Sequence, residues 1–369
     1  MKKHLVATAV AAAFAVPVSA QVTISGNIEA GYTSKDVRAL SSTTSTVKQS
    51  NIGSGHFGTP QINFGATEDL GGGLKASFLL SREFNTGSGS DDVTGQYNQT
   101  WVSLAGGFGT VQVGKFAHAT RDAGGVYRFM GDIGRLAGSM NSLDERVNGI
   151  QYVSPAFNGF TVSLASSDAD HSVTSATQAT DNAKPASLSS MGLRGSVAGV
   201  NFSIGRETLK FLATQAGANQ AELDLDTIGA GFKIGPANVG VVVAKQELQL
   251  ATGASGGQRD ARGVHVAYPM GAFTIGASMT NYQVSPAAGG AKPKADITTF
   301  GARYALSKRT SIVGSYQQLK NSGAADALAV SSGASAINTG TIGGTRGLGV
   351  VETTGQTTSG IGLTVVHNF

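Results

Sequence analysis

The chain has 369 residues, of which 40% are hydrophobic, 52 are Gly and none is Cys, and its formal net charge at pH 7 is +4. The lack of Cys excludes a small secreted scaffold held together by disulfides, and the small charge gives no electrostatic basis for binding nucleic acid. No apolar run after residue 20 approaches the ~20 residues of a membrane-spanning helix, which argues against a helical inner-membrane protein.

The first 20 residues are typical of a secretory signal peptide. A short basic start, Met1 to His4, is followed by an apolar run from Leu5 to Val16 and by Val18-Ser19-Ala20, which has the small-x-small form of a cleavage site. We therefore predict a signal peptide over residues 1–20, with cleavage after Ala20. Loss of its two lysines lowers the Lys and Arg total from 27 to 25 against 23 Asp and Glu, which leaves a mature net charge of about +2.

The rest of the chain alternates apolar and polar residues with a period of two over many short segments. This period is typical of strands with one apolar face. In the first segment, for example, Val22, Ile24 and Ile28 alternate with polar residues, and a polar loop is expected after it at residues 34–57. The pattern predicts sixteen strands, at residues 22–33, 58–68, 74–84, 98–106, 109–116, 149–154, 159–167, 188–197, 200–211, 222–233, 238–249, 260–269, 271–284, 295–305, 311–320 and 357–369.

Tight turns alternate strictly with long polar loops along this series. The first tight turn, Glu68 to Gly73, is built from residues that tolerate positive φ. Short periplasmic turns and long external loops are typical of outer-membrane barrels, and a sheet in lipid must close because open edges leave backbone groups unpaired. We therefore predict an all-β fold, a 16-stranded antiparallel transmembrane β-barrel that forms a single domain over residues 21–369 and encloses an aqueous lumen.

The last predicted strand ends on an aromatic residue. Ile361, Leu363 and Val365 occupy alternate positions, and the sequence stops at Phe369 with no polar tail. In a soluble protein, a strand that ends on an exposed aromatic residue would promote aggregation. At a membrane interface such a residue is favourable, because aromatic rings form girdles there. We predict that this strand pairs with the first one and closes the barrel.

Charged and aromatic residues in the predicted strands have expected positions. A charge that faces the bilayer centre costs about 2–4 kcal/mol, so charged strand residues are expected to face the lumen. This assigns Lys75, Arg194 and Arg303 to the inner face. Charges at strand ends near the long loops either meet lipopolysaccharide phosphates or are simply solvated; they include Arg206, Lys210 and Arg262. Aromatic residues near strand ends are girdle candidates, among them Trp101, Tyr268, Phe273 and Tyr304.

Five short segments occur in a fixed order along the mature chain: Thr67 to Ala76, Gly106 to Val111, Asn148 to Pro155, Ala305 to Thr310, and Gly362 to Phe369. Together they resemble the general porins of the Gram-negative outer membrane, specifically the β-proteobacterial trimeric type. The resemblance implies a homotrimer in outer-membrane lipid, a third loop folded into the lumen, and passive diffusion of small hydrophilic solutes and ions through that constriction. It also implies that the outer-membrane assembly machinery recognises Phe369.

The constriction residues are predicted from the same resemblance. Lys115 corresponds to a basic constriction residue of the family, although strict alternation puts it with Val111 and Val113 on the lipid side. The third loop, about residues 117–148, is the most charged segment. Its charges either line the constriction or form local salt bridges that hold the loop's shape; they are Arg121, Asp122, Arg128, Asp132, Arg135, Asp144, Glu145 and Arg146.

One departure from the family weakens the basic side of the pore. Two positions of the second predicted strand that are usually basic are Gln61 and Gly65 in this chain. The lumen face of this chain is therefore expected to carry fewer basic side chains than the family implies. Together with the small mature net charge, this favours a mild anion preference at most.

Two other classes of function fit the sequence less well. An enzyme on a barrel needs a catalytic cluster, but the six His residues are scattered without metal-ligand spacing, and no Gly-x-Ser-x-Gly elbow stands at a strand-to-helix turn. An adhesin or an occluded structural barrel fits the long loops, but no large passenger segment is present. We therefore predict a channel and not an enzyme, with no metal and no cofactor.

Overall fold

The computed structural model describes residues 21–38, 46–54, 57–88, 97–117, 146–167, 185–211, 222–249, 255–286, 292, 294–322, 331–332, 335–336 and 357–369. Within these ranges no helix is long and apolar enough to cross a membrane. The predicted signal peptide lies outside them. The strands are β1 Thr23–Arg38, β2 Thr46–Gly53, β3 Gln61–Gly71, β4 Leu74–Glu83, β5 Gln99–Gly106, β6 Gly109–Ala117, β7 Arg146–Val153, β8 Phe160–Ser167, β9 Pro185–Val197, β10 Val200–Phe211, β11 Glu222–Ile234, β12 Ala237–Gln249, β13 Ser255–Met270, β14 Phe273–Pro286, β15 Lys294–Ala305, β16 Thr310–Ser322, β17 Ser331–Ser332, β18 Ser335–Ala336 and β19 Thr357–Asn368.

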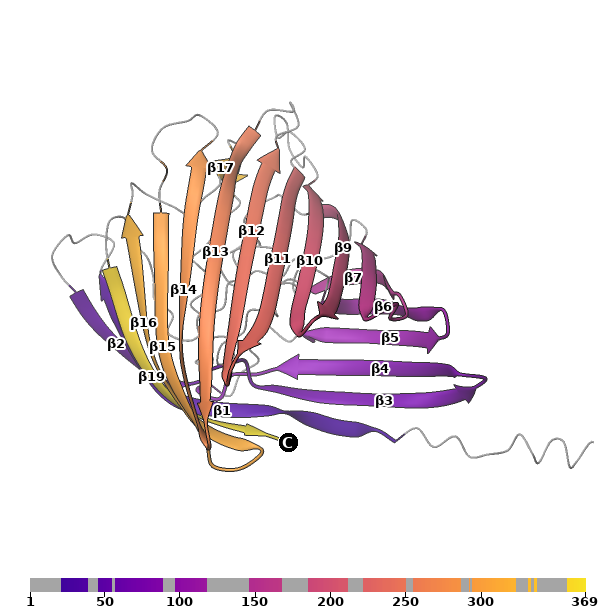
Figure 1. Ribbon diagram of the computed structural model, residues 1–369, viewed down its shortest axis with the longest axis horizontal. Coiled ribbons are helices and arrows are strands. Elements are labelled where there is room, and N and C mark those ends of the chain that lie inside the picture. The colour runs from indigo at the N-terminus through magenta and orange to yellow at the C-terminus, as the bar shows by residue number, and fades with distance from the viewer. Residues whose placement is uncertain are drawn as a thin grey trace, which may run out of the picture.

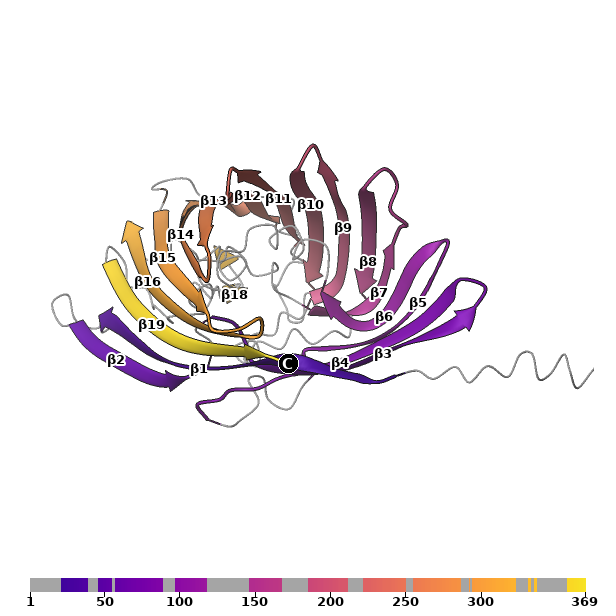
Figure 2. The same cartoon turned by 60° about the horizontal axis from the view of Figure 1, so that its bottom comes forward.

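All of these strands except β17 and β18 belong to one sheet of 17 strands. From β3 to β16 each strand pairs antiparallel with the next one in the chain. Figures 1 and 2 show them following one another around a curved wall. β19 then pairs with β16 on one side and with β1 on the other, so the wall is closed. Without the short β2, sixteen strands form the wall, which confirms the predicted 16-stranded barrel.

The first and last strands of the chain, β1 and β19, meet at the seam of the barrel. The ladder runs from Asn27 opposite Asn368 to Lys35 opposite Gly360. At its end, the N–H of Gly26 donates to the carbonyl oxygen of Phe369 at 3.1 Å, and the N–H of Phe369 donates back to Gly26 at 3.1 Å. These bonds satisfy backbone groups that lipid cannot satisfy. The last strand therefore closes the barrel, as predicted.

The segment predicted as a polar loop at residues 34–57 contains strand over much of its length. β1 continues to Arg38, and β2 returns along it. β3 then becomes the neighbour of β1 and pairs with its first five residues, Thr23 to Asn27. Sequence reasoning missed this hairpin because few apolar residues alternate in it, as Thr46-Val47-Lys48-Gln49 illustrates. β17 and β18 form a separate two-stranded ladder.

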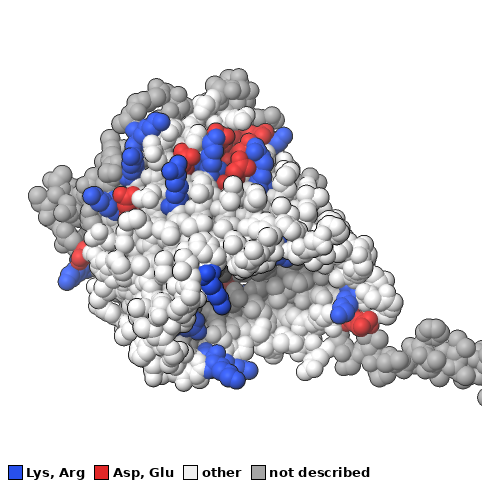
Figure 3. Space-filling model, in the orientation of Figure 1, with Lys and Arg blue, Asp and Glu red and all other residues white. Residues whose placement is uncertain are grey.

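Alternate residues of the wall strands face outward and form a broad apolar surface. On β19, Ile361, Leu363 and Val365 are 53%, 58% and 48% exposed, whereas the alternate residues Thr364 and Val366 are 1% and 2% exposed. Figure 3 shows one side of the barrel as a wide zone that is largely free of charged side chains, with charges gathered above and below it. A band of this kind is what a lipid-facing surface requires.

The inner face is apolar near the long-loop ends of several strands. Side chains from six strands form a buried cluster there, and Trp101 of β5 packs against it. Trp101 is therefore an interior residue and not the girdle residue that its place near a strand end suggested. The cluster consists of Phe116, Ala165, Leu188, Leu209, Leu223 and Leu248.

Gly114→Val is expected to lower the yield of folded barrel. Gly114 has a φ of 126°, and a Cβ at this position would lie 2.3 Å from the carbonyl oxygen of Thr100 on β5. A backbone atom cannot move aside as a flexible side chain can, so the β5–β6 ladder would have to distort. The yield is measured as the refolded fraction that keeps compact mobility on unheated gels. Gly107→Ala is the control, because a Cβ there meets nothing within 4 Å, and equal yields would contradict the prediction.

Candidate functional site

Three predicted lumen cations lie on the inner face by the register of their ladders. Arg194 is the partner of Ser203, which is 3% exposed, and Arg303 is the partner of Val313, which is completely buried. Lys75 is the second residue of β4 and alternates with the outward apolar residues of that strand. All three lie within a few residues of a strand end that is joined to the next strand by a short turn. They therefore stand at the short-turn end of the lumen.

A fourth cation at the same end, Lys233, was missed by sequence reasoning. It precedes Ile234, which is 63% exposed on the outer face, so Lys233 faces inward at the end of β11. The strict alternation of that strand, continued to its last residues, is the signal that could have found it. The exposed acidic residue on the inner face at this end is Asp69, the register partner of Lys75. Over the described ranges, the exposed charge of the short-turn end is therefore mainly positive.

Other charged residues on the inner face are buried in the wall. Glu207 and Arg259 are 0% and 1% exposed. Glu83 is 5% exposed and accepts a hydrogen bond from the side-chain amide of Asn98 at 2.6 Å. These side chains therefore present little surface to water. In the part of the chain that the structure describes, no group of His, Asp and Glu side chains is arranged to hold a metal ion.

Residues 57–59, which precede β3, cross the inner side of the wall, and we call them the inner strap. Glu29 of β1 faces inward, is 1% exposed, and accepts hydrogen bonds from the N–H groups of Phe57 at 3.3 Å and Gly58 at 2.8 Å. Asn27, on the same face of β1, donates its side-chain N–H to the carbonyl oxygen of Thr59 at 3.2 Å. Because these two side chains point inward, the strap that they hold lies inside the barrel.

The aromatic ring of the strap extends from β1 to the strands beyond the seam. Phe57 packs against Val313 of β16 and Val366 of β19, both of which are buried on the inner face. The guanidinium carbon of Arg303 on β15 lies 5.9 Å from the centre of the Phe57 ring, within the range of a cation–π interaction. Sequence reasoning assigned Phe57 to a polar loop and the next two residues to the start of the second predicted strand, so it did not predict the strap. The strap and Arg303 therefore form a lumen feature that only the structure reveals.

Most of the predicted constriction residues lie outside the described residues. Seven of them fall in the segment 118–145: Arg121, Asp122, Arg128, Asp132, Arg135, Asp144 and Glu145. Arg146 is the first residue of β7, but its side chain is not among those described. The assignment of these charges to the constriction stays a prediction.

Lys115 lies in the β5–β6 and β6–β7 ladders, and neither ladder shifts register there. The next residue, Phe116, is buried in the inner cluster, whereas Val113 is 49% exposed on the outer face. The register therefore assigns Lys115 to the outer face with Val113, the direction that alternation predicts. The place at the constriction that the resemblance implies would require the side chain to reach around the strand end, so we expect Lys115 to lie away from the neck.

The sequence of this barrel matches a known protein family. A family model described as "Gram-negative porin" matches residues 7–324. The chain belongs to the Gram-negative porin family. It is therefore a protein of the outer membrane of a Gram-negative bacterium, as the sequence predicts.

Two curated relatives agree with the predicted resemblance to β-proteobacterial porins. The porin is 34% identical over 185 residues to "Major outer membrane protein P.IB" of Neisseria gonorrhoeae, and 33% identical over 174 residues to "Outer membrane porin protein 32" of Delftia acidovorans. These alignments cover 47% and 43% of this chain, and 50% and 48% of the relatives. The chain thus spans about half the length of the curated relatives it matches.

Solved structures share the fold over almost the whole porin chain. The anion-selective porin from Comamonas acidovorans matches with a TM-score of 0.73 at 21% identity, and covers 95% of this chain and 100% of that chain. OmpF of Salmonella typhi matches with a TM-score of 0.64 at 12% identity, and covers 95% of this chain and 98% of that chain. At these identities the likeness shows the fold of the barrel and not its selectivity.

The outer face of the porin carries ion pairs toward the long loops. Arg206 of β10 lies 2.9 Å from Asp224 and 3.2 Å from Asp226 of β11, and Lys210 lies 3.6 Å from Glu222. Figure 3 shows positive and negative side chains side by side in this region, above the apolar zone. Two of the predicted rim cations therefore already have carboxylate partners within the porin.

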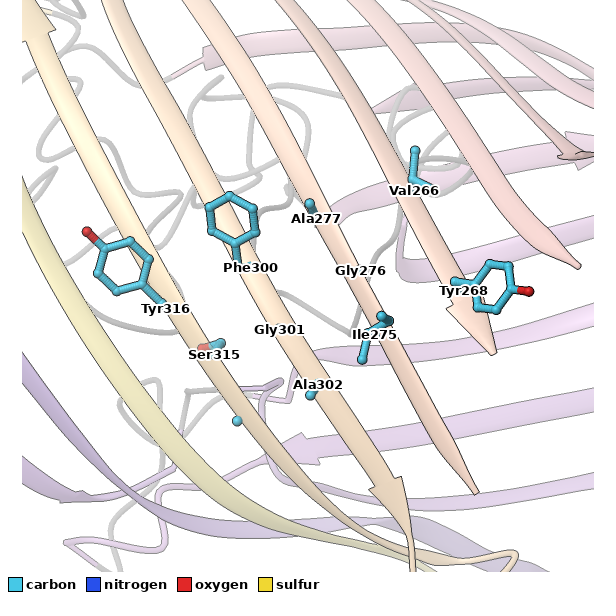
Figure 4. Close-up of a pocket in the computed structure, with 11 residues that line it drawn as sticks. Val266, Tyr268, Ile275, Gly276, Ala277, Phe300, Gly301, Ala302, Ser315 and Tyr316 are labelled. Atoms are coloured by element: carbon cyan, nitrogen blue, oxygen red, sulfur yellow. The ribbon is translucent and has the colours of Figure 1, made fainter. Parts of the chain in front are cut away.

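A groove of about 680 Å³ lies on the outer face of the porin between β13 and β16. Small side chains such as Ala277 and Ala302 line it, and Tyr268, Phe300 and Tyr316 stand beside them (Figure 4). No charged residue lines this groove, and its large side chains are exposed apolar or aromatic ones: Val266, Tyr268, Ile275, Phe300 and Tyr316. It is a surface for lipid or protein packing rather than a site for polar solutes.

Proposed function

We propose that this porin forms a water-filled channel for passive diffusion of small hydrophilic solutes and ions across the outer membrane. The observation that carries the proposal is the closed 16-stranded wall, apolar outside and lined near the short turns by exposed charges. A barrel of this size has room for an aqueous lumen. Because the chain belongs to a family of porins, a channel is favoured over an enzyme.

We further propose that the channel has a weak preference for anions. Lys75, Arg194, Lys233 and Arg303 face the lumen near the short turns, against the exposed Asp69. Fixed cations along a water-filled path raise the local concentration of anions. The structural neighbour from Comamonas acidovorans is itself named an anion-selective porin.

Size exclusion is proposed to come from the third loop, folded inward with its charges at the neck. Support for this comes from the strand that leads into the loop. Phe116, the second-last residue of β6, is buried in the apolar cluster on the inner face. A loop that starts beside this cluster has an apolar surface inside the barrel on which to pack.

The proposed partners are two further copies of the chain, outer-membrane lipid with lipopolysaccharide, and the assembly machinery through the C-terminal strand. One structural neighbour, OmpT of Vibrio cholerae, was solved in a trimer form. Arg262 is an exposed cation on the outer face toward the long loops, where lipid phosphates are expected. Crosslinking of the purified protein tests the trimer.

Liposome swelling tests diffusion and size exclusion together. Vesicles that contain the refolded porin are expected to swell in isotonic solutions of neutral sugars, at rates that fall steeply with sugar size. Protein-free vesicles give the baseline. Folded porin that gives no more swelling than this baseline would contradict the proposed function.

Lys115→Glu is expected to leave the reversal potential of the channel in a salt gradient unchanged. The physical reason is the uninterrupted register that assigns Lys115 to the outer face. A change of two charge units at the constriction would instead shift the reversal potential toward cation selectivity. The reversal potential is measured in planar bilayers. A shift toward cation selectivity would contradict the prediction and would assign Lys115 to the constriction.

A further inference from the structure

We infer that the inner strap and Arg303 form a second constriction at the short-turn end of the lumen, and that Arg303 is a binding site for permeating anions such as chloride and small carboxylates. This inference rests on the proposed channel function. It concerns described residues only and does not depend on the third loop.

The strap reduces the open cross-section of the lumen. Residues 57–59 form an extra layer of chain on the inner side of the wall, over Asn27 and Glu29 of β1. Phe57 extends this layer over Val313 and Val366. A layer of backbone and an aromatic ring occupies space that water would otherwise fill.

Hydrogen bonds to a buried carboxylate and to the chain after β4 hold the strap in place. A buried carboxylate that accepts two backbone N–H groups makes charge-assisted hydrogen bonds, which are stronger than bonds between neutral groups. Glu29 holds Phe57 and Gly58 in this way. Further along, the N–H of Phe84 donates to the carbonyl oxygen of Pro60 at 3.0 Å, so the segment is also tied to β4 and its loop. The strap is therefore a fixed part of the wall.

The constriction carries a positive charge that faces the lumen. Arg303 is half-buried on the inner face, and its guanidinium lies over the Phe57 ring. The ring restricts the position of the guanidinium and leaves its N–H groups available to an anion. Glu29, the acidic residue beneath the strap, directs its two oxygens to backbone N–H groups. The charged group that the constriction exposes to permeating solutes is therefore the guanidinium of Arg303.

The position of the charge is tested with Arg303→Cys in a chain that contains no Cys of its own. Reaction with a cationic thiosulfonate reagent restores a positive charge, and reaction with an anionic one introduces a negative charge. We expect these reactions to shift the chloride-to-potassium permeability ratio in opposite directions. We expect each shift in the permeability ratio to be about twofold. The reason is that a single charge several ångströms from the ion path acts through a water-like dielectric.

Arg262→Cys is the matched control, because Arg262 is exposed on the outer face of β13. Its modification is expected to leave the permeability ratio unchanged. Equal behaviour of the two variants would overturn the role of Arg303 while leaving the channel itself intact. An unmodified wild type that is folded but does not conduct would instead overturn the proposed function.

The narrowing is tested with Phe57→Ala, which should raise the single-channel conductance and admit larger polyethylene glycols. Phe300→Ala is the control, since Phe300 is 53% exposed on the outer face. Compact mobility on unheated gels verifies that both variants fold. If both variants conduct like wild type, the strap does not constrict the lumen and the inference is wrong.

Discussion

A chain that ends at residue 356 is expected to yield no folded barrel. Residues 357–369 contain β19, which pairs with β16 from Thr310 to Lys320 and with β1 from Asn27 to Lys35. Without β19, both neighbours would present unpaired N–H and C=O groups to lipid, where each unsatisfied group costs several kcal/mol. β1 and β16 are separated by one strand, so they cannot simply re-pair without a change in strand tilt and shear around the barrel.

The measurement is refolding into lipid vesicles, followed by far-UV circular dichroism and by mobility on unheated gels. The full-length variant Phe369→Leu is the control, because it keeps the backbone bonds between residues 26 and 369. We expect the control to fold in vitro and the truncated chain to fail. A truncated chain that folds as well as the control would show that β19 is not needed for closure.

Val113→Arg is expected to destabilise the barrel by about 2–4 kcal/mol, the range measured for a cation that faces the middle of the bilayer. Val113 lies near the middle of β6 and is 49% exposed on the outer face. The neighbouring Gln112 faces inward, where its register partners are Ser103 and Gln151. Gln112→Arg is therefore expected to cost much less, because its charge remains in a polar environment.

Equilibrium unfolding in denaturant, in vesicles that allow reversible folding, gives the two free energies. Both variants introduce an arginine at neighbouring positions of the same strand, so the comparison tests which face each position occupies. Equal losses of stability, or a larger loss for Gln112→Arg, would contradict the assignment of lipid and lumen faces on this strand.

The strands of this porin could be predicted from the sequence because the bilayer imposes a simple pattern on them. Residues such as Leu363 and Val365 must be apolar on one face, while the lumen face varies freely. The hairpin of β1 and β2 escaped prediction because its residues near Lys48 and Gln49 do not alternate with apolar ones. A strand that is not selected for contact with lipid carries no such pattern.

The lumen was harder to predict than the wall. That Arg194 and Arg303 face inward follows from alternation, but the inner strap does not. Phe57 is a single aromatic residue in a polar stretch, and its partners Glu29 and Val366 are distant in the sequence. Closure of the barrel places β1 and β19 side by side beneath the strap. The alternation of residues within one strand does not predict that the chain before β3 crosses over both of them.

The channel claim itself is tested most directly by single-channel recording from the purified wild-type porin in a planar bilayer with a potassium chloride gradient. We predict stepwise currents and a reversal potential of the sign that indicates a weak preference for chloride. Closure in three equal steps would further agree with a trimer. Folded protein that inserts into the bilayer and conducts no ions would contradict the account.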